Sequence, residues 1–174
     1  MRRDLLVDKA KEGNQKAYKE LFDQNVNNLY RYLRQFSNDR DQVEDWVQRA
    51  FIKAFKNILS FQGNSTFKTW LFKIGINEMR TDLRTSSKRP NDEFEENIHG
   101  DKKEPDNNFE WHEEMKWLLS DLDETKKNIF ILFEVEGYKH YEIADLLDIS
   151  ENSSKTILHR TRKILQDKWL KNQR

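Results

Sequence analysis

Residues 67–84 read FKTWLFKIGINEMRTDLR, and this stretch determines how the chain around it must fold. Its apolar residues recur at helical spacing on nearly every side of the predicted helix. A helix that is apolar all round is stable only where other helices cover it, which places this one at the centre of a helical domain. The exception is a stripe of polar residues at steps of four, three and four, which lie on one face. The stripe consists of Lys73, Asn77, Arg80 and Arg84.

A cationic stripe with one amide is suited to nucleic acid, because lysine and arginine bind phosphates and asparagine reads base edges. Phe61, Phe67 and Trp70 flank the loop before the helix, where aromatic rings could stack on an unpaired base. The spacing of Trp70 also fits a core position, and of the two interpretations the core is favoured.

Two predicted helices precede this stretch. The first has an apolar face at steps of three and four, and after a turn Asp39 or Asp41 caps the second. On the polar face of the second helix Ile52 lies beside Asp45, Gln48, Arg49 and Phe55, which favours a protein contact, although single exposed isoleucines are common. The expected buried residues are Tyr18, Phe22, Val26, Leu29, Leu33 and Phe36 in the first helix, and Val43, Trp46, Val47, Ala50, Phe51, Ala54 and Ile58 in the second.

Composition supports an all-α fold and excludes several kinds of site. Glycine and proline together make up only 7 of 174 residues, too few for the turns of a β protein. The absence of cysteine excludes disulfides, zinc-thiolate sites and cysteine nucleophiles. No apolar run approaches the roughly 20 residues of a membrane span, and the first residues lack the features of a signal peptide. A cytoplasmic protein without direct membrane insertion is expected.

Charge is balanced in total, at 31 basic and 31 acidic residues, but not along the chain. Residues 1–90 carry a net +7, residues 91–114 −8, residues 115–149 −4 and residues 150–174 +5. Two basic blocks suggest two contacts with a polyanion, although chance asymmetry on solvated faces gives the same pattern. Helical periodicity stops between Thr85 and about Asn108. We therefore predict two small helical domains, 1–88 and 113–174, joined by a flexible acidic linker at 89–112.

The second domain has the pattern of a helix-turn-helix. Gly137 can end one helix, a short helix spans Tyr141 to Leu147, and Ser150 is the expected N-cap of the last helix. The last helix should bury Ile157, Leu158, Ile164 and Leu165. The other side of this helix is suited to enter the major groove of DNA. Residues 152–156 would then face base edges, and the later arginines would meet phosphates. The alternative is a helical hairpin with a solvated basic face. The exposed residues would be Lys155, Thr156, His159, Arg160, Arg162 and Lys163.

Enzymatic chemistry is not indicated. His99, His112, His140 and His159 lie in different segments without metal-ligand spacing, and no glycine-rich phosphate loop is present. The neighbouring acids Glu113–Glu114 and Asp121–Asp123 fit helix starts better than paired catalytic carboxylates. We expect no catalytic residue, no metal and no cofactor.

Three stretches, in order, resemble the extracytoplasmic-function (ECF) subfamily of sigma-70 RNA polymerase sigma factors. Residues 41–55, DQVEDWVQRAFIKAF, are similar to region 2.2 of that family. Residues 61–84, which begin FQGNSTFKTWLFKIGIN and end DLR, resemble regions 2.3 and 2.4. The stretch from Glu142-Ile143-Ala144 to His159-Arg160-Thr161-Arg162-Lys163 resembles region 4.2. Only the predicted linker lies outside the resemblance.

The resemblance implies a bacterial transcription initiation factor that binds core RNA polymerase and opens promoters. The polymerase would offer the clamp helices of its largest subunit and the flap of the second-largest, and an anti-sigma factor is a further candidate partner. Implied polymerase contacts are Asp45, Gln48, Arg49, Ile52 and Phe55. The −10 element would meet Phe61, Ser65, Thr66, Phe67, Lys73, Asn77, Arg80 and Arg84, with a flipped base enclosed by the loop. The −35 element would meet Ser153, Lys155, Thr156, His159, Arg160, Arg162 and Lys163.

Two positions depart from the family pattern. Ser154 stands where an apolar packing residue is common, and Gly75 replaces a frequent alanine at a cost of about 1 kcal/mol in helix propensity. Two other functions are compatible with the C-terminal pattern, a stand-alone helix-turn-helix regulator and an inhibitory partner. A stand-alone regulator would leave the stripe of the first domain and Ile52 unexplained. A test of whether promoter binding depends on polymerase distinguishes both alternatives from a sigma factor.

Overall fold

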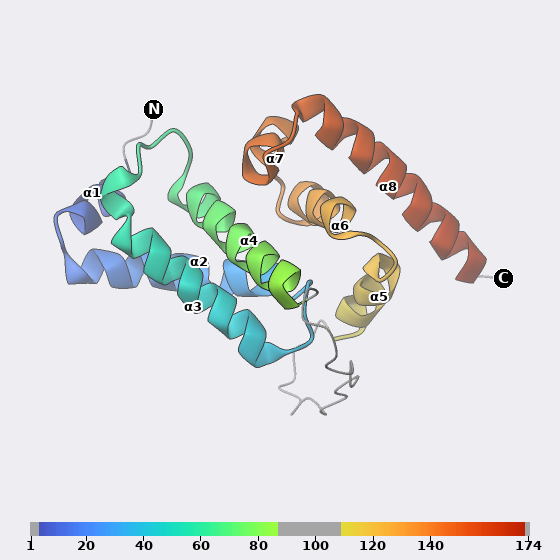
Figure 1. Cartoon of the computed structure of the whole chain (residues 1–174), viewed down its shortest axis with the longest axis horizontal. Helices are drawn as coiled ribbons and strands as arrows, with labels where there is room; N and C mark the ends of the chain where they lie inside the picture. The colour runs from blue at the N-terminus through green and yellow to red at the C-terminus, as the bar shows by residue number, and fades with distance from the viewer. Residues whose placement is uncertain (1–3, 87–108, 173–174) are drawn as a thin grey trace.

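The structure, a computed structural model, describes residues 4–86 and 109–172, and every regular element in these two stretches is helical. This confirms the predicted all-α fold with a group of helices on each side of the acidic segment (Figure 1). The N-terminal group contains α1 (Leu5–Lys11), α2 (Gln15–Leu33), α3 (Arg40–Lys56), the short 3-10 helix η1 (Ile58–Ser60) and α4 (Phe67–Ser86). The C-terminal group contains α5 (Phe109–Leu119), α6 (Glu124–Phe130), the π-helical turn η2 (Ile131–Val135), α7 (His140–Leu147) and α8 (Glu151–Asn172).

In the N-terminal group α4 packs on α2 and α3, as its apolar surface predicted. All seven expected residues from Val43 to Ile58 are at most 5% exposed, which confirms the buried face of α3; Ile58 itself lies just beyond α3, in η1. Asp39, not Asp41, caps this helix: its Oδ1 accepts hydrogen bonds from the backbone of Asp41 at 3.0 Å and Gln42 at 3.3 Å. Local capping chemistry and helical periodicity therefore account for α3.

The expected face of α2 was partly wrong. Phe22 is 39% exposed, although its ring packs on that of Phe51 at 4.7 Å between centroids. Because α2 contacts α1, α3 and α4, its buried side is broader than one stripe and is centred elsewhere. The buried residues are Ala17, Leu21, Asn25, Leu29, Tyr32 and Leu33.

Gly75 lies in the contact between α4 and α2. A Cβ atom built on Gly75 would be 2.8 Å from Cδ1 of Leu29, which is fully buried. Glycine at this position therefore lets two core helices pack more tightly than alanine would, which offsets its weak helix propensity.

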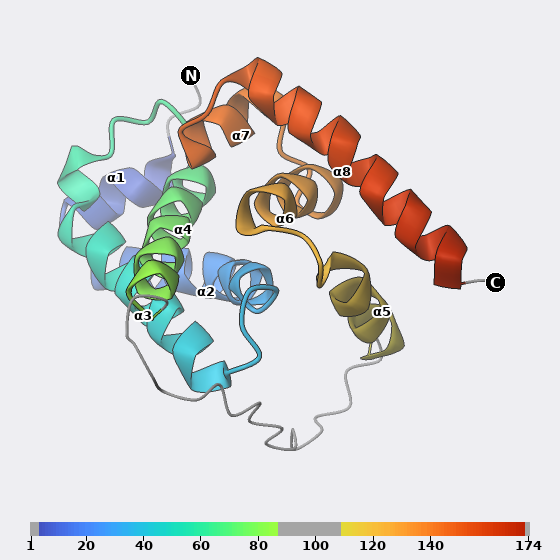
Figure 2. The ribbon, with the colours of Figure 1, turned by 45° about the vertical axis from the view of Figure 1, so that its right-hand side comes forward.

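In the C-terminal group α6 and α7 pack against the long helix α8, and α5 contacts α8 farther along (Figure 2). Leu158 and Leu165 of α8 are buried as expected, and Ile157 is half-buried. Ile164 is 41% exposed, so its predicted burial was wrong. The predicted linker at 89–112 falls mainly outside the described residues.

The two groups are in contact. Figure 2 shows α4 facing α6 and α7 of the C-terminal group, and α4 packs directly on α7. None of the helices within residues 4–86 and 109–172 is both long and apolar enough to cross a membrane.

Candidate nucleic-acid interface

The four stripe residues of α4 differ in exposure. Asn77 and Arg84 are exposed, whereas Lys73 and Arg80 are half-buried. Lys73 Nζ binds Asp145 Oδ1 of α7 at 3.0 Å, and Arg80 Nε donates to Glu124 Oε1 of α6 at 2.5 Å. Two cations of the stripe are thus paired with acids of the C-terminal group.

A pocket of about 230 Å³ lies between the loop before α4 and the first turns of that helix. Trp70 is half-buried: its ring packs on Phe61 at 5.2 Å between centroids, as the core interpretation expects, and the residue also lines the pocket. Lys73 lines the pocket and is also a member of the stripe. Its walls are formed by Ser60, Phe61, Gln62, Asn64, Ser65, Thr69, Trp70, Lys73 and Asp145.

Two loop residues expected at this site have other positions. Phe67 is 2% exposed and packs against Phe55, Phe61 and Trp70 in the core, so its ring offers no surface for stacking on a base. Thr66 is exposed, and its Oγ1 accepts a hydrogen bond from the backbone nitrogen of Thr69 at 3.1 Å, which caps the start of α4.

The outer face of α3 presents three of the five residues expected to contact polymerase. Asp45, Gln48 and Ile52 are exposed, and Ile52 is 52% accessible. Arg49 is half-buried and paired with Asp45. Phe55 is half-buried too, since its ring packs on Tyr18, Phe51 and Phe67.

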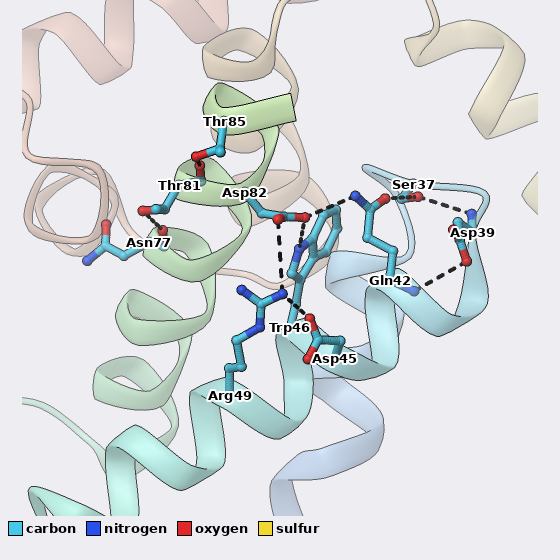
Figure 3. Close-up of polar contacts among 10 residues, drawn as sticks. All are labelled: Ser37, Asp39, Gln42, Asp45, Trp46, Arg49, Asn77, Thr81, Asp82 and Thr85. Atoms are coloured by element: carbon cyan, nitrogen blue, oxygen red, sulfur yellow. Dashed lines mark hydrogen bonds and ion pairs between the residues drawn. The ribbon is translucent and has the colours of Figure 1, made fainter. Parts of the chain in front are cut away.

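Asp82 joins α4 to α3 and was missed as a structural residue by sequence analysis (Figure 3). Its Oδ2 accepts hydrogen bonds from Nε1 of the fully buried Trp46 at 2.9 Å and from Nε2 of Gln42 at 3.0 Å. Arg49 lies 4.0 Å from Oδ1. A buried indole needs an acceptor, which is the signal that could have pointed to an acid on a neighbouring helix.

A second acid of α4 was also missed. Glu78 is only 8% exposed although it follows the exposed Asn77, and Lys53 of α3 pairs with it. Both acids therefore hold α4 in place against the helix that carries Ile52.

In the C-terminal group α7, a tight turn and α8 form the predicted helix-turn-helix. Asp148 adopts a left-handed conformation (φ 56°) at the end of α7, which aspartate tolerates better than most residues. Ser150 Oγ accepts a hydrogen bond from the backbone of Ser153 at 3.0 Å, which confirms it as the N-cap. Arg162, although exposed, pairs with Glu134 at 2.6 Å and lies over the ring of Phe133. The other exposed residues expected to meet DNA are Ser153, Lys155, Thr156, His159, Arg160 and Lys163.

Ser154, the departure from the family pattern in α8, is fully buried and packs against α7 as a polar residue. Its Oγ is 2.9 Å from Nδ1 of His140, whose ring stacks on Phe133 at 4.5 Å. Burial, together with the charges of Lys155 and Arg162, lowers the pKa of His140 despite the opposing effect of Glu151. A serine–histidine hydrogen bond thus joins the start of α7 to the first turn of α8, where the family pattern has apolar packing.

The fold and these surfaces define a two-part helical DNA-binding protein that ends in a helix-turn-helix. The chain matches sigma-70 region 2 over residues 21–89 and sigma-70 region 4 over residues 113–165. It belongs to the sigma-70 family and, within it, to the ECF sigma factors. It is therefore a transcription initiation factor that acts with RNA polymerase at promoters and not an enzyme, and the stand-alone regulator is not favoured.

Curated relatives extend over nearly the whole chain. It is 28% identical to the ECF RNA polymerase sigma-E factor of Haemophilus influenzae, with 94% of this chain and 93% of the relative covered. The sigma-E factor of Escherichia coli K12 is also 28% identical, with 94% and 92% covered.

Two solved structures share the fold. CnrH, in complex with the cytosolic domain of CnrY, has a TM-score of 0.72 and 24% identity, with 94% of both chains covered. The sigma factor RpoE of Bartonella quintana, in complex with the anti-sigma factor NepR, has a TM-score of 0.69 and 23% identity, with 87% of this chain and 96% of that chain covered.

Proposed function

We propose that α4 and the pocket at its start bind the unpaired non-template strand of the −10 element. The observation that carries this assignment is that Lys73 lines both the pocket and the stripe. Phe61 is only 6% exposed, so the half-buried Trp70 is the proposed stacking surface. A base inserted against Trp70 would leave its backbone beside Lys73, with the following nucleotides directed along the stripe toward Asn77. The amide of Asn77 is then the base-reading group, and Arg80 and Arg84 are phosphate contacts.

The exposed face of α3, with Asp45, Gln48 and Ile52, is the proposed contact with the clamp helices of the polymerase. A half-exposed isoleucine between polar neighbours is typical of a protein contact. Since Asp82 and Glu78 tie this helix to α4, binding at α3 would also hold the −10 surface in a defined position.

The exposed side of α8 is the proposed reader of the −35 element. Lys155, Thr156 and His159 are near the start of the helix, where a recognition helix meets base edges, and Arg160 and Lys163 follow as phosphate contacts. To take part, Arg162 would have to leave Glu134, and Lys155 would have to leave Glu151.

The proposal has three further parts. The functional units are 1–88 for polymerase and −10 binding, 89–112 as the connecting segment and 113–174 for −35 binding. The site of action is the cytoplasm, where bacterial RNA polymerase transcribes. An anti-sigma factor is a proposed partner, because the RpoE structure with a similar fold was solved with one.

Run-off transcription from genomic fragments, with core polymerase and with or without the protein, tests the assignment. We expect specific starts only when the protein is added, and alignment of their upstream sequences should give both promoter elements. No starts from a protein that binds polymerase would instead favour an inhibitory role, and no polymerase binding would favour the stand-alone regulator.

Two variants test the individual surfaces. Asn77→Ala should weaken discrimination among −10 variants, whereas Asn27→Ala, an exposed asparagine on α2, should leave it unchanged. Ile52→Glu should lower affinity for core polymerase, whereas Leu59→Glu, at an apolar residue that is 76% exposed, should have no such effect. An equal effect of Asn77→Ala on all −10 sequences, or unchanged polymerase affinity of Ile52→Glu, would refute the respective role.

A further inference from the structure

Lys11 is the last residue of α1, and its side chain reaches the start of the loop before α4. Its Nζ donates a hydrogen bond to the backbone carbonyl of Phe61 at 2.6 Å, across 50 residues of sequence. The same Nζ lies over the ring of Phe61, 5.7 Å from the ring centroid. One half-buried ammonium therefore contacts both the main chain and the side chain of a residue that lines the pocket.

The carbonyl of Phe61 takes its partner from outside its own helix. Phe61 follows η1 in an extended conformation (φ −68°, ψ 111°), so its carbonyl is not part of a helical ladder of hydrogen bonds. A lysine is a strong partner for it, because a hydrogen bond from an ammonium is roughly twice as strong as one between neutral groups. The half-buried position of Lys11 also reduces competition from water. The contact thus fixes the chain at the point where the loop leaves η1.

Phe61 in turn supports the proposed stacking surface. Its ring packs on Trp70 at 5.2 Å between centroids and on the buried Phe67 at 6.3 Å. Phe61 is itself buried, so it holds Trp70 in place and does not offer a base a surface of its own. Because closely packed rings move together, a displacement of Phe61 would also displace Trp70 in the pocket wall.

We propose that Lys11 is a positioning residue for capture of the −10 base: it holds Phe61, and through Phe61 the Trp70 ring, in the geometry that accepts an unpaired base. This inference rests on the proposed role of the pocket in −10 binding. The described residues that form the pocket wall do not include Lys11, so it acts through Phe61 and not on DNA. Helix α1 carries none of the residues assigned above to DNA or polymerase, and the inference gives it a part in promoter recognition.

Three variants separate this role from the simple loss of a positive charge. Lys11→Met removes the ammonium but keeps an unbranched side chain of similar helix propensity, so α1 should remain folded. Lys11→Arg keeps a cationic donor for the carbonyl. Lys9→Met is the matched control, because Lys9 is an exposed lysine in the last turn of the same helix. Urea unfolding of each variant shows whether the helical domain is intact.

Hydrogen exchange of the full chain without DNA tests the anchor itself. The backbone amide of Phe61 donates to the carbonyl of Ile58 at 3.2 Å, next to the carbonyl that Lys11 holds. We expect this amide to exchange about fivefold faster in Lys11→Met than in the wild type, because local opening no longer breaks the lysine contact. Lys11→Arg and Lys9→Met should exchange at close to the wild-type rate. Equal exchange in Lys11→Met and Lys9→Met would overturn the proposal.

Binding of holoenzyme to DNA tests the consequence. The probe is a promoter duplex with an unpaired −10 region, of the sequence found by run-off transcription. A scan of abasic sites along its non-template strand identifies the captured base as the one whose removal weakens wild-type binding most. We expect Lys11→Met to weaken binding of the intact probe about fivefold, and that of the probe abasic at this position less than about twofold. Lys11→Arg should restore most of the loss, and Lys9→Met should bind both probes as the wild type does.

The possible failures are distinguishable. Equal losses by Lys11→Met on the intact and the abasic probe would refute the positioning role alone, because the effect would then not pass through base capture. A direct phosphate contact would also refute it, and would lower the salt slope of binding by about 1 on both probes. If no abasic site weakens wild-type binding, the proposed −10 pocket fails and the role of Lys11 fails with it, whatever the exchange rate of the Phe61 amide.

Discussion

Replacing Asp82 by alanine should loosen the joint between α3 and α4. The carboxylate accepts hydrogen bonds from Trp46 and Gln42, and its side chain is 25% exposed, so water can reach one side of it. Trp46 is fully buried, however, and its indole N–H would have no other acceptor. A buried donor left without a partner costs about 1–3 kcal/mol, and hydrogen bonds to charged groups lie toward the upper end.

We therefore expect Asp82→Ala to lower the free energy of unfolding by about 2 kcal/mol, and Asp82→Asn, which keeps one acceptor oxygen, by about 1 kcal/mol. Urea unfolding followed by circular dichroism measures both changes. Asp45→Ala is the control, because it removes an exposed acid on α3, the helix that carries Trp46, and should change stability by no more than about 0.5 kcal/mol.

A double-mutant cycle with Trp46→Phe tests the cause. Phenylalanine removes the N–H donor, so Asp82→Ala in that background should cost less than about 1 kcal/mol. If the loss of about 2 kcal/mol persists without the indole, the unpaired donor is not the reason. The explanation given for this joint would then be refuted.

Three further predictions concern other parts of the chain. Gly75→Ala should lower the free energy of unfolding in urea by about 1 kcal/mol, because overpacking against Leu29 outweighs the gain in helix propensity. A gain in stability would contradict this and show that the Leu29 side chain moves aside at little cost. The lowered pKa of His140 means that the native state resists protonation, so thermal stability should fall as the pH drops below its ordinary 6.5, and His140→Gln should abolish that part of the pH dependence. Arg160→Ala should weaken binding of holoenzyme to all −35 sequences alike and reduce the salt slope by about 1, whereas a loss confined to one base position would make Arg160 a base reader.

Much of the fold follows from local chemistry. The buried face of α3, the caps Asp39 and Ser150 and the glycine after η2 were all predictable, since each depends on helical spacing or on a cap within three residues. The exposed residues of α8 and of the α3 face were predictable for the same reason. Periodicity failed at Phe22 and Ile164, because it identifies an apolar side without saying how much of that side a neighbour covers.

Sequence alone thus determined that this protein is helical, that it has two basic blocks at 1–90 and 150–174, and that its motifs are those of an ECF sigma factor. Only the tertiary structure decided which side chains meet across the chain. Asp82 meets Trp46 from 36 residues away, Asp145 meets Lys73 from 72 and Asn128 meets Tyr32 from 96. The physical reason is that such pairs depend on how whole helices dock, and the same exposed cation on α4 can face solvent, a phosphate or a carboxylate according to that docking.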